Sequence, residues 1–341
     1  DCSGRRRVRD VGAPAEKVRC IGTCWSITVL ASILFRIRPQ KPPRFSLSEL
    51  PSEPHIAQRE VTSGGAMDSE TRQITESESE TPSPEKFHRY PWYSPRFWHG
   101  MKVSVWYKLL RAGRFRIHPS RIPPFIGVSF AAPFNSLLTV TQRLLFGRKL
   151  AAAEFHGPPV FIVGHWRSGT TLLHELMVRD DRLSSPSTFQ CFVPNHFHVS
   201  EWFFRRFAWW LLPGKRPMDN MAAGFDHPQE DEFALLVLGL PSPYRRIAFP
   251  NQGPVDLDYL DFDGVPQADV DRWLAELRKF LLSVSSATGR PLVVKSPTHT
   301  GRIAQLAREF PEAKFIHLSR NPRELFPSTC RLWHSLDDVQ A

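Results

Sequence analysis

One short stretch of the chain combines residue types that bind anions with a spacing that would aim them at a single ligand. Residues 160–171 read Val-Phe-Ile-Val-Gly-His-Trp-Arg-Ser-Gly-Thr-Thr. The apolar run at the start is typical of a buried parallel strand, a polar loop with two glycines follows, and a helical pattern begins at Thr170. A strand, a glycine loop and a helix start together direct backbone N–H groups and the positive end of a helix at a phosphate. The stretch therefore predicts a site for a phosphate-bearing ligand.

The loop differs from the loops of nucleoside triphosphatases at one position. Gly164 and Gly169 have the spacing of a Walker A loop, but Thr170 stands where that motif has the lysine that contacts the β- and γ-phosphates. The loop carries Arg167 instead. We therefore expect a donor with a shorter phosphate chain than that of ATP.

The sequence Arg167-Ser-Gly-Thr-Thr resembles the phosphosulfate loop of the PAPS-dependent sulfotransferases, in the form found in the bacterial and tyrosylprotein-sulfotransferase-like branches. These enzymes move a sulfuryl group from 3′-phosphoadenosine 5′-phosphosulfate (PAPS) to a hydroxyl or an amine and release PAP. The resemblance implies a P-loop-like three-layer α/β fold, with helices flanking a mostly parallel central sheet. It also implies that the donor is held by Gly164, Arg167, Ser168, Gly169, Thr170 and Thr171.

Two further segments are similar to the same family. In 314–328 a strand, turn and helix pattern places Arg320 and Ser328 where the family has an arginine and a serine that bind the 3′-phosphate. A guanidinium and a hydroxyl suit that group, since arginine can grip a phosphate in a bidentate fashion. In 291–316 Lys295 follows a strand at the place of a family lysine that stabilises the transition state. The resemblance covers roughly residues 86–341.

The general base is not indicated by the resemblance. The window in which related enzymes carry a glutamate, residues 188–196, contains no carboxylate. Glu230 and Glu232, from an acidic cluster before an apolar run, are two candidates, although acids are also favoured in the first turn of any helix. His196 is a third candidate, because histidine is a suitable base near neutral pH, and His299 beside Lys295 is a minor one.

Length and composition predict one α/β domain with an appended N-terminal region. We expect residues 1–85 to be a basic and then acidic low-complexity extension without stable structure, and residues 86–341 to be the sulfotransferase domain. The apolar run 20–35 is interpreted either as a short membrane anchor or as part of a non-native extension before Met67. Because related chains continue beyond the serine that Ser328 matches, we expect the domain to be truncated at its C-terminus.

Residues 101–156 predict two helices with apolar and basic side chains. They are interpreted either as helices packed over the sheet or as a membrane-surface or lipid-acceptor face. The stretch 203–212 is strongly apolar and is interpreted as an ordinary buried helix, as a cap over the acceptor pocket or as a membrane contact. Residues 272–285 predict an amphipathic helix.

The formal net charge of +10 resides in residues 86–341, because the basic residues 1–45 and the acidic residues 46–85 cancel. A basic domain suits a multiply anionic donor. The five cysteines show no metal-ligand spacing, so we expect a reducing, cytoplasmic location, with peripheral membrane contact as an open alternative, and no metal. The expected acceptor is a lipid, glycan or small molecule rather than a nucleic acid. Two other functions stay open: a P-loop kinase or NTPase, and an inactive PAP-binding interaction module.

Overall fold

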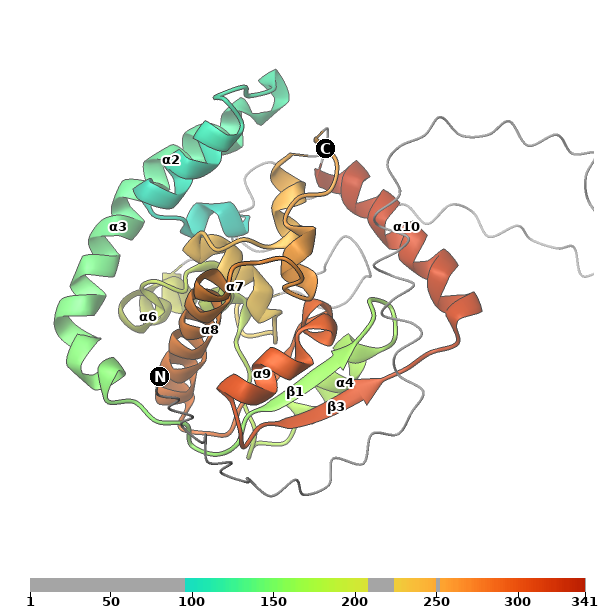
Figure 1. Ribbon diagram of the computed structural model, residues 1–341. Coiled ribbons are helices and arrows are strands. Elements are labelled where there is room, and N and C mark those ends of the chain that lie inside the picture. The colour runs from blue at the N-terminus through green and yellow to red at the C-terminus, as the bar shows by residue number, and fades with distance from the viewer. Residues whose placement is uncertain (1–95, 208–223, 250–251, 341) are drawn as a thin grey trace, which may run out of the picture. The chain divides into compact units, whose positions relative to one another are not determined.

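The computed structural model describes residues 96–207, 224–249 and 252–340 (Figure 1). The predictions for the extension 1–85, including the apolar run 20–35, lie outside the described residues, as do positions 208–212 of the predicted apolar stretch.

A parallel sheet of three strands lies at the centre of the described region. Strand β1 (Val160–Gly164) pairs with β2 (Val293–Lys295) on one side and with β3 (Lys314–Leu318) on the other, which gives the order β2-β1-β3. The β1 side chains from Phe161 to Val163 are fully buried, which explains the continuous apolar run in the sequence. The predicted mixed α/β fold with a parallel sheet flanked by helices is confirmed.

Helices precede, follow and separate the strands. In chain order they are η1 (Phe97–Gly100), α2 (Val103–Ala112), η2 (Pro119–Arg121), α3 (Ile122–Ala151), α4 (Thr170–Met177), α5 (Thr188–Phe192), α6 (Phe197–Phe207), α7 (Asp231–Leu238), η4 (Pro243–Ala248), η6 (Leu257–Leu260), α8 (Gln267–Thr288), η7 (Pro297–Gly301), α9 (Ile303–Glu309) and α10 (Pro322–Gln340). The predicted helical region 101–156 and the predicted amphipathic helix 272–285 correspond to α2 with α3 and to α8.

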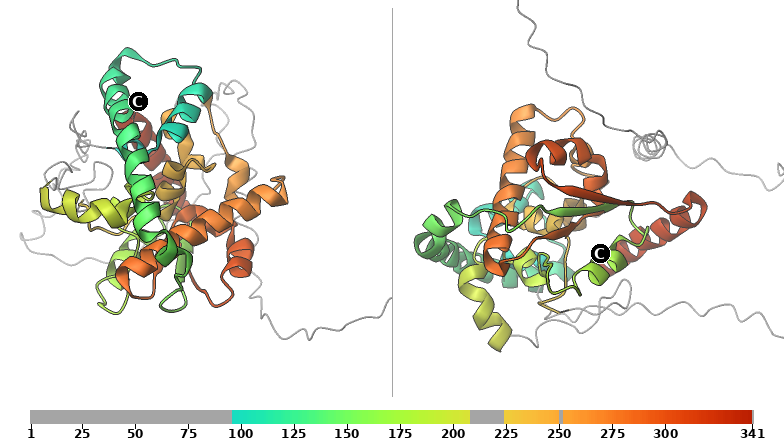
Figure 2. Two further views of the ribbon diagram at one scale, coloured as in Figure 1. Left: turned by 90° about the vertical axis from the view of Figure 1, so that its left-hand side faces the viewer. Right: turned by 90° about the horizontal axis from the view of Figure 1, so that it is seen from below.

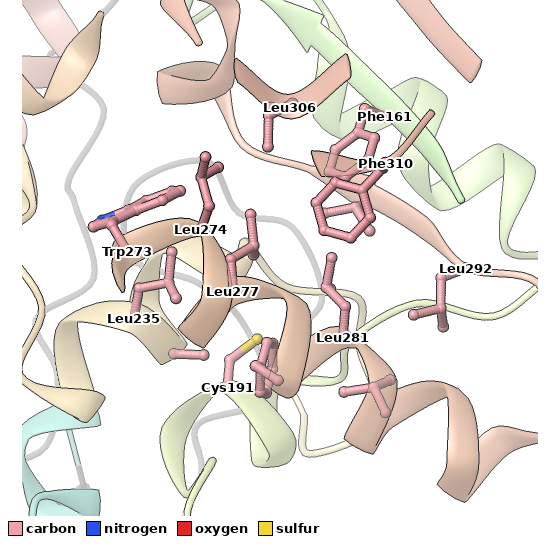
Figure 3. Packing of buried hydrophobic residues seen from close by; sticks show 14 of the residues in the cluster. Phe161, Cys191, Leu235, Trp273, Leu274, Leu277, Leu281, Leu292, Leu306 and Phe310 are labelled. Carbon is pink, nitrogen blue, oxygen red and sulfur yellow. The ribbon is translucent and has the colours of Figure 1, made fainter. Parts of the chain in front are cut away.

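The main hydrophobic core lies between the sheet and helix α8 (Figure 3). Trp273, Leu277 and Leu281 form the apolar stripe of α8, and they share one cluster with Phe161 of β1 and Leu235 of α7. Each of these side chains is fully buried. Burial of one large apolar side chain stabilises the fold by about 1.5–3 kcal/mol. This cluster therefore holds α7 and α8 firmly against the sheet.

A second cluster joins the N-terminal helices to α7. Met101, Val105 and Tyr244 pack there against Leu236 and Val237. Helix α3 contacts η1, α2, α6 and α8, and it runs along the outside of the domain on the opposite side from α10 (Figures 1 and 2). The main contacts of α3 are therefore with other helices, α8 of the sheet-facing core among them.

Within the described residues, one helical stretch, Pro119–Ala151, is long and apolar enough to cross a membrane by length and composition alone. Only 17% of its most apolar window is buried. Most of the helix in this window is therefore at least partly exposed.

Candidate active site

The loop after β1 folds tightly against the end of β3. Gly164, Arg167 and Gly169 all have positive φ angles, of 151°, 69° and 100°. A Cβ atom at Gly164 would lie 2.6 Å from the carbonyl oxygen of Leu318 and 2.9 Å from Oγ of Ser168. A side chain at position 164 would therefore force the loop away from β3.

The same loop opens helix α4. Gly169 is the N-cap, and Thr170 and Thr171 are the first two helical residues, as the phosphate-loop pattern predicts. The N–H of Gly164 donates to Oγ1 of Thr300 at 2.9 Å, which ties the start of the loop to the segment after β2. Oγ of Ser168 is buried and has no hydrogen-bond partner among the described residues. A hydroxyl in that state is suited to a ligand that brings its own acceptor.

Two arginines and a serine from distant segments meet at this loop. Nε of Arg167 donates to Oγ of Ser328 at 3.1 Å, and Nη1 of Arg320 donates to the carbonyl oxygen of Arg167 at 3.3 Å. Arg320 also forms an ion pair with Glu324 at 3.1 Å. Both arginines are exposed. The carboxyl ends of β1 and β3 thus present two cations and a hydroxyl to solvent at one place.

A chain of hydrogen bonds leads from the loop to Lys295. The indole N–H of Trp166 donates to the Tyr244 hydroxyl at 2.9 Å, and that hydroxyl donates to Oε2 of Glu230 at 2.7 Å. Nζ of Lys295 donates to the other carboxylate oxygen, Oε1, at 2.6 Å. The side chain of Lys295 is 3% exposed and that of Glu230 is 14% exposed. Burial raises the pKa of Tyr244 well above its usual value, and the nearby Glu230 charge acts in the same direction. Tyr244 therefore remains a phenol that donates to Glu230.

The two acids after Glu230 have separate buried partners. Asp231 accepts hydrogen bonds from Ser296 at 2.6 Å and from His299 at 2.8 Å. Burial tends to raise the pKa of Asp231, but the charge and hydrogen bond of His299 outweigh it, and the pKa is lowered overall. His299 is thus hydrogen-bonded to Asp231, whereas Lys295 is hydrogen-bonded to Glu230.

Glu232 forms an ion pair with Arg302 at 2.6 Å, and both side chains are fully buried. The hydroxyl of Thr298 donates to the same carboxylate at 2.9 Å. The carboxylate of Glu232 is thus enclosed between groups of the protein, whereas that of Glu230 is partly open. Of the two predicted glutamates, the structure brings only Glu230 to Lys295.

His196 lies in another part of the domain. Its Nε2 donates to Oδ1 of Asn135 in α3 at 3.1 Å, and its Nδ1 lies 2.9 Å from Oγ of Ser200 in α6. Burial lowers its pKa to about 4. Its hydrogen bonds run between two helices and do not connect it to Arg167 or Lys295, so the structure does not bring this predicted candidate into the site.

Sequence reasoning missed Trp166, Tyr244 and Thr300 as members of the site. Trp166 and Thr300 lie in the segments 160–171 and 291–316, which the sequence analysis matched to the family. Their closeness in sequence to Arg167 and Lys295 was a signal that could have indicated them. Tyr244 lies in the short helix η4 directly after Ser242 and Pro243, and the sequence around it matches no catalytic motif. Only the packing of η4 on α7 places its hydroxyl beside Glu230. Among the described residues, no group of three or more His, Cys, Asp or Glu side chains is arranged to hold a metal ion.

Comparison with known proteins agrees with these features. The model of the sulfotransferase family matches residues 158–340. The omega-hydroxy-beta-dihydromenaquinone-9 sulfotransferases Stf3 of Mycobacterium bovis and Mycobacterium tuberculosis are each 43% identical to this chain over 245 residues. That match covers 72% of this chain and 63% of each relative, so the chain spans less than two thirds of the relatives' length.

Two solved structures have lower similarity. Sulfotransferase STF1 from M. tuberculosis H37Rv has a TM-score of 0.41 at 15% identity, and the match covers 70% of this chain and 72% of that one. Sulfotransferase STF9 from Mycobacterium avium has a TM-score of 0.41 at 18% identity, over 70% of this chain and 68% of that one. The family model, the sequence relatives and the phosphate-type loop after β1 together show that this chain belongs to the sulfotransferase family.

Proposed function

We propose that this protein transfers a sulfuryl group from PAPS to the hydroxyl of an acceptor and releases PAP. The observation that carries the proposal is the meeting of Arg167, Arg320 and Ser328 at the loop between β1 and α4. Family membership and the 43% identity to a sulfotransferase support it independently.

The donor site fits a nucleotide with two separate anionic groups. Backbone N–H groups at the start of α4 and the buried Ser168 hydroxyl would hold the 5′-phosphosulfate. Arg320 and Ser328 lie beside this loop and would hold the 3′-phosphate, which ATP lacks. The position of the Walker lysine is occupied by Thr170, which disfavours a kinase or an NTPase.

Sulfuryl transfer forms a bond between the acceptor oxygen and sulfur while the bond from sulfur to the 5′-phosphate oxygen breaks. The electron pair of the broken bond stays on PAP, and the acceptor proton must pass to a base. We propose Glu230 as that base, because it alone of the predicted candidates contacts Lys295 and is linked through Tyr244 to Trp166 in the loop. Arg167 and Lys295 would neutralise the negative charge that develops on the transferring group.

We propose a lipid alcohol as the acceptor class. The relatives named above act on a hydroxylated menaquinone, which is a membrane lipid. Leu172 and Leu176 of α4, which follow the donor loop directly, expose large apolar side chains. Activity on a lipid at the cytoplasmic surface of a membrane is consistent with both observations.

The proposal is tested in two steps on the whole chain. Calorimetry without metal should show tighter binding of PAP than of AMP, and radiolabelled PAPS should then label a hydroxylated isoprenoid quinol but not a short soluble alcohol. Equal affinity for PAP and AMP would contradict the donor assignment. Selective PAP binding without transfer to any acceptor would favour an inactive binding module, and phosphate transfer from ATP with Mg²⁺ would favour a kinase.

A further inference from the structure

Helix α3 buries two amide side chains on its inner side and exposes large apolar side chains on its outer side. The buried side carries Asn135 and Gln142 together with Val128 and Ala132. Nδ2 of Asn135 donates to the carbonyl oxygen of Met101 at 3.0 Å, and Oε1 of Gln142 accepts from the N–H of His198 at 3.0 Å. The packing of α3 on the domain therefore relies in part on amide hydrogen bonds.

The outward side of α3 forms an apolar face of eight exposed residues. These residues are Ile122, Ile126, Phe130, Phe134, Leu137, Val140, Leu144 and Leu145. At 3.6 residues per turn they fall within a sector of about 140°, opposite the buried residues, and extend over about 35 Å of helix. Two of them, Phe130 and Leu144, are each 80% exposed. A continuous face of this kind marks a surface that another apolar body covers.

The surroundings of this face are basic. From Arg96 to Ala153 the sequence contains ten Lys or Arg residues and no Asp or Glu. Exposed cations lie before α3 in the sequence, at Lys108, Arg111, Arg114 and Arg116, and near its C-terminal end, at Arg143, Arg148 and Lys149. An apolar helical face with basic residues toward both ends is typical of helices that lie in the headgroup region of a membrane.

We propose that the apolar face of α3 binds the surface of a bilayer that contains anionic lipids, with the helix axis parallel to the membrane plane. The other side of α3 is packed against α2, α6 and α8, so the helix lies on the membrane and does not cross it. A second copy of the chain is a poor occupant, because a symmetric contact would bring two basic surfaces without acids against each other. The surface of α3 alone supports this membrane binding. If the protein also has the proposed function, binding to the membrane would bring it close to its lipid acceptor.

Vesicle flotation of the full 341-residue chain tests the apolar part of this proposal. The wild type should float with vesicles of phosphatidylcholine and phosphatidylglycerol, and less with phosphatidylcholine alone. The double variant Phe130→Asn/Leu144→Asn should lower the partition coefficient on the order of ten-fold or more, because two large apolar side chains no longer enter the bilayer. The matched control is Phe326→Asn on α10, an exposed apolar residue outside α3, which should bind as the wild type does when the single variant Phe130→Asn binds less.

The electrostatic part uses a second pair of variants. Arg148→Glu/Lys149→Glu should abolish the preference for anionic vesicles, whereas Arg290→Glu/Arg308→Glu, at exposed positions outside α2 and α3, should preserve it. Unchanged flotation of both α3 variants would overturn the proposal, as would a wild type that does not float. A change of molecular mass on sedimentation equilibrium, caused by the α3 substitutions, would show that a second copy covers the face. No assay here uses PAPS, so these results are independent of the proposed transfer.

Discussion

At the scale of single residues, the proposed donor site depends on side chains that reach one another from distant segments of the chain. Arg167 leaves the end of β1 and Arg320 the end of β3, and Ser328 lies on α10. Their hydrogen bonds hold the two guanidinium groups beside one loop although they are 153 positions apart in sequence. A nucleotide that carries phosphates on both its 5′ and 3′ positions could therefore engage both cations, and one with a single phosphate could not.

This arrangement predicts the effect of Arg320→Ala. Loss of a charge-assisted contact of about 1.5–3 kcal/mol should weaken PAP binding by roughly ten- to hundred-fold and leave AMP binding nearly unchanged. Calorimetry with both nucleotides measures the difference, with Arg308→Ala on α9 as an exposed control. If both nucleotides lost affinity equally, Arg320 would not be the 3′-phosphate ligand.

Glu230 is the residue on which the proposed mechanism depends. Glu230→Gln keeps the size and shape of the side chain and one oxygen that accepts from Lys295 or Tyr244, but an amide does not take up the acceptor proton. Transfer should fall by about 10²–10⁴-fold while PAP affinity stays close to that of the wild type. Single-turnover transfer and PAP calorimetry measure the two quantities, and Glu312→Gln, at an exposed position before β3, is the control. Transfer at the wild-type rate would remove Glu230 from the mechanism.

At the scale of elements, the start of α7 connects the proposed site to the segment after β2 through ion pairs. Three consecutive acids have three different partners there. Glu230 pairs with Lys295, Asp231 with His299, and Glu232 with Arg302. The two inner pairs are fully buried and join α7 to η7 and to the start of α9. The outermost carboxylate, on Glu230, is thereby held at the end of β2.

Glu232→Gln should therefore act on stability first. It leaves the Arg302 guanidinium buried without its counter-charge, which costs about 3–5 kcal/mol in similar cases. The free energy of unfolding in urea should drop by that order, and Glu230→Gln should lower it less, because both side chains of the Glu232–Arg302 pair are fully buried whereas water reaches the Glu230 end of the pair with Lys295. The opposite ranking, with Glu230→Gln the more destabilising change, would contradict the structural role assigned to Glu232.

The contact between α3 and α6 predicts a pH dependence. His196 has a pKa lowered to about 4 in the folded state, against 6.5 for the ordinary side chain, because burial disfavours the charged ring. The unfolded chain thus binds the proton first as pH falls. The stabilisation is complete above about pH 6.5 and is lost between that pH and about 4, by up to about 1.4 kcal/mol for each pH unit.

Urea unfolding between pH 7 and pH 4.5 measures this dependence. His196→Gln, which can still donate to Asn135, should show a shallower loss of stability on acidification than the wild type. His317→Gln, at an exposed position of β3, should keep the wild-type slope. Identical slopes for the wild type and His196→Gln would mean that His196 is not the group responsible.

At the scale of the whole molecule, charge and apolar surface are unevenly distributed. The +10 charge belongs to residues 86–341, and ten cations of this region fall in the acid-free segment from Arg96 to Ala153. A net positive field around the site should strengthen the binding of a multiply charged nucleotide at long range.

The salt dependence of binding follows from this field. Raising the salt concentration from 50 to 200 mM shortens the Debye length from roughly 14 to 7 Å and should weaken PAP binding several-fold, more than it weakens AMP binding. Titrations at four salt concentrations measure the two slopes, and equal slopes would argue that only local contacts recognise the donor.

The sequence predicted the local parts of the fold and site. The strand, loop and helix at 160–171 were expected from hydrophobicity and glycine spacing, and strands were also expected before Lys295 and at the start of 314–328, where β2 and β3 lie. Such features depend on neighbouring residues, so they can be read from a short window. The roles of Arg167, Lys295, Glu230, Arg320 and Ser328 remain predictions that the experiments above test.

Tertiary structure decided which residues meet. Nothing local distinguishes Glu230 from Glu232, and only the partners supplied by β2 and η7 leave one carboxylate partly open and enclose the other. Tyr244 joins the site because η4 packs on α7, and His196 is separated from it because Asn135 binds its ring. The sequence likewise did not indicate which side of α3 faces solvent, because the helix is apolar on most of its circumference. In the structure, the amide hydrogen bonds of Asn135 and Gln142 lie on the side that faces the domain. Local patterns thus specified the strands, the loop and the helices, and long-range packing specified the chemistry of the side chains, because burial and partnership are properties of the folded chain.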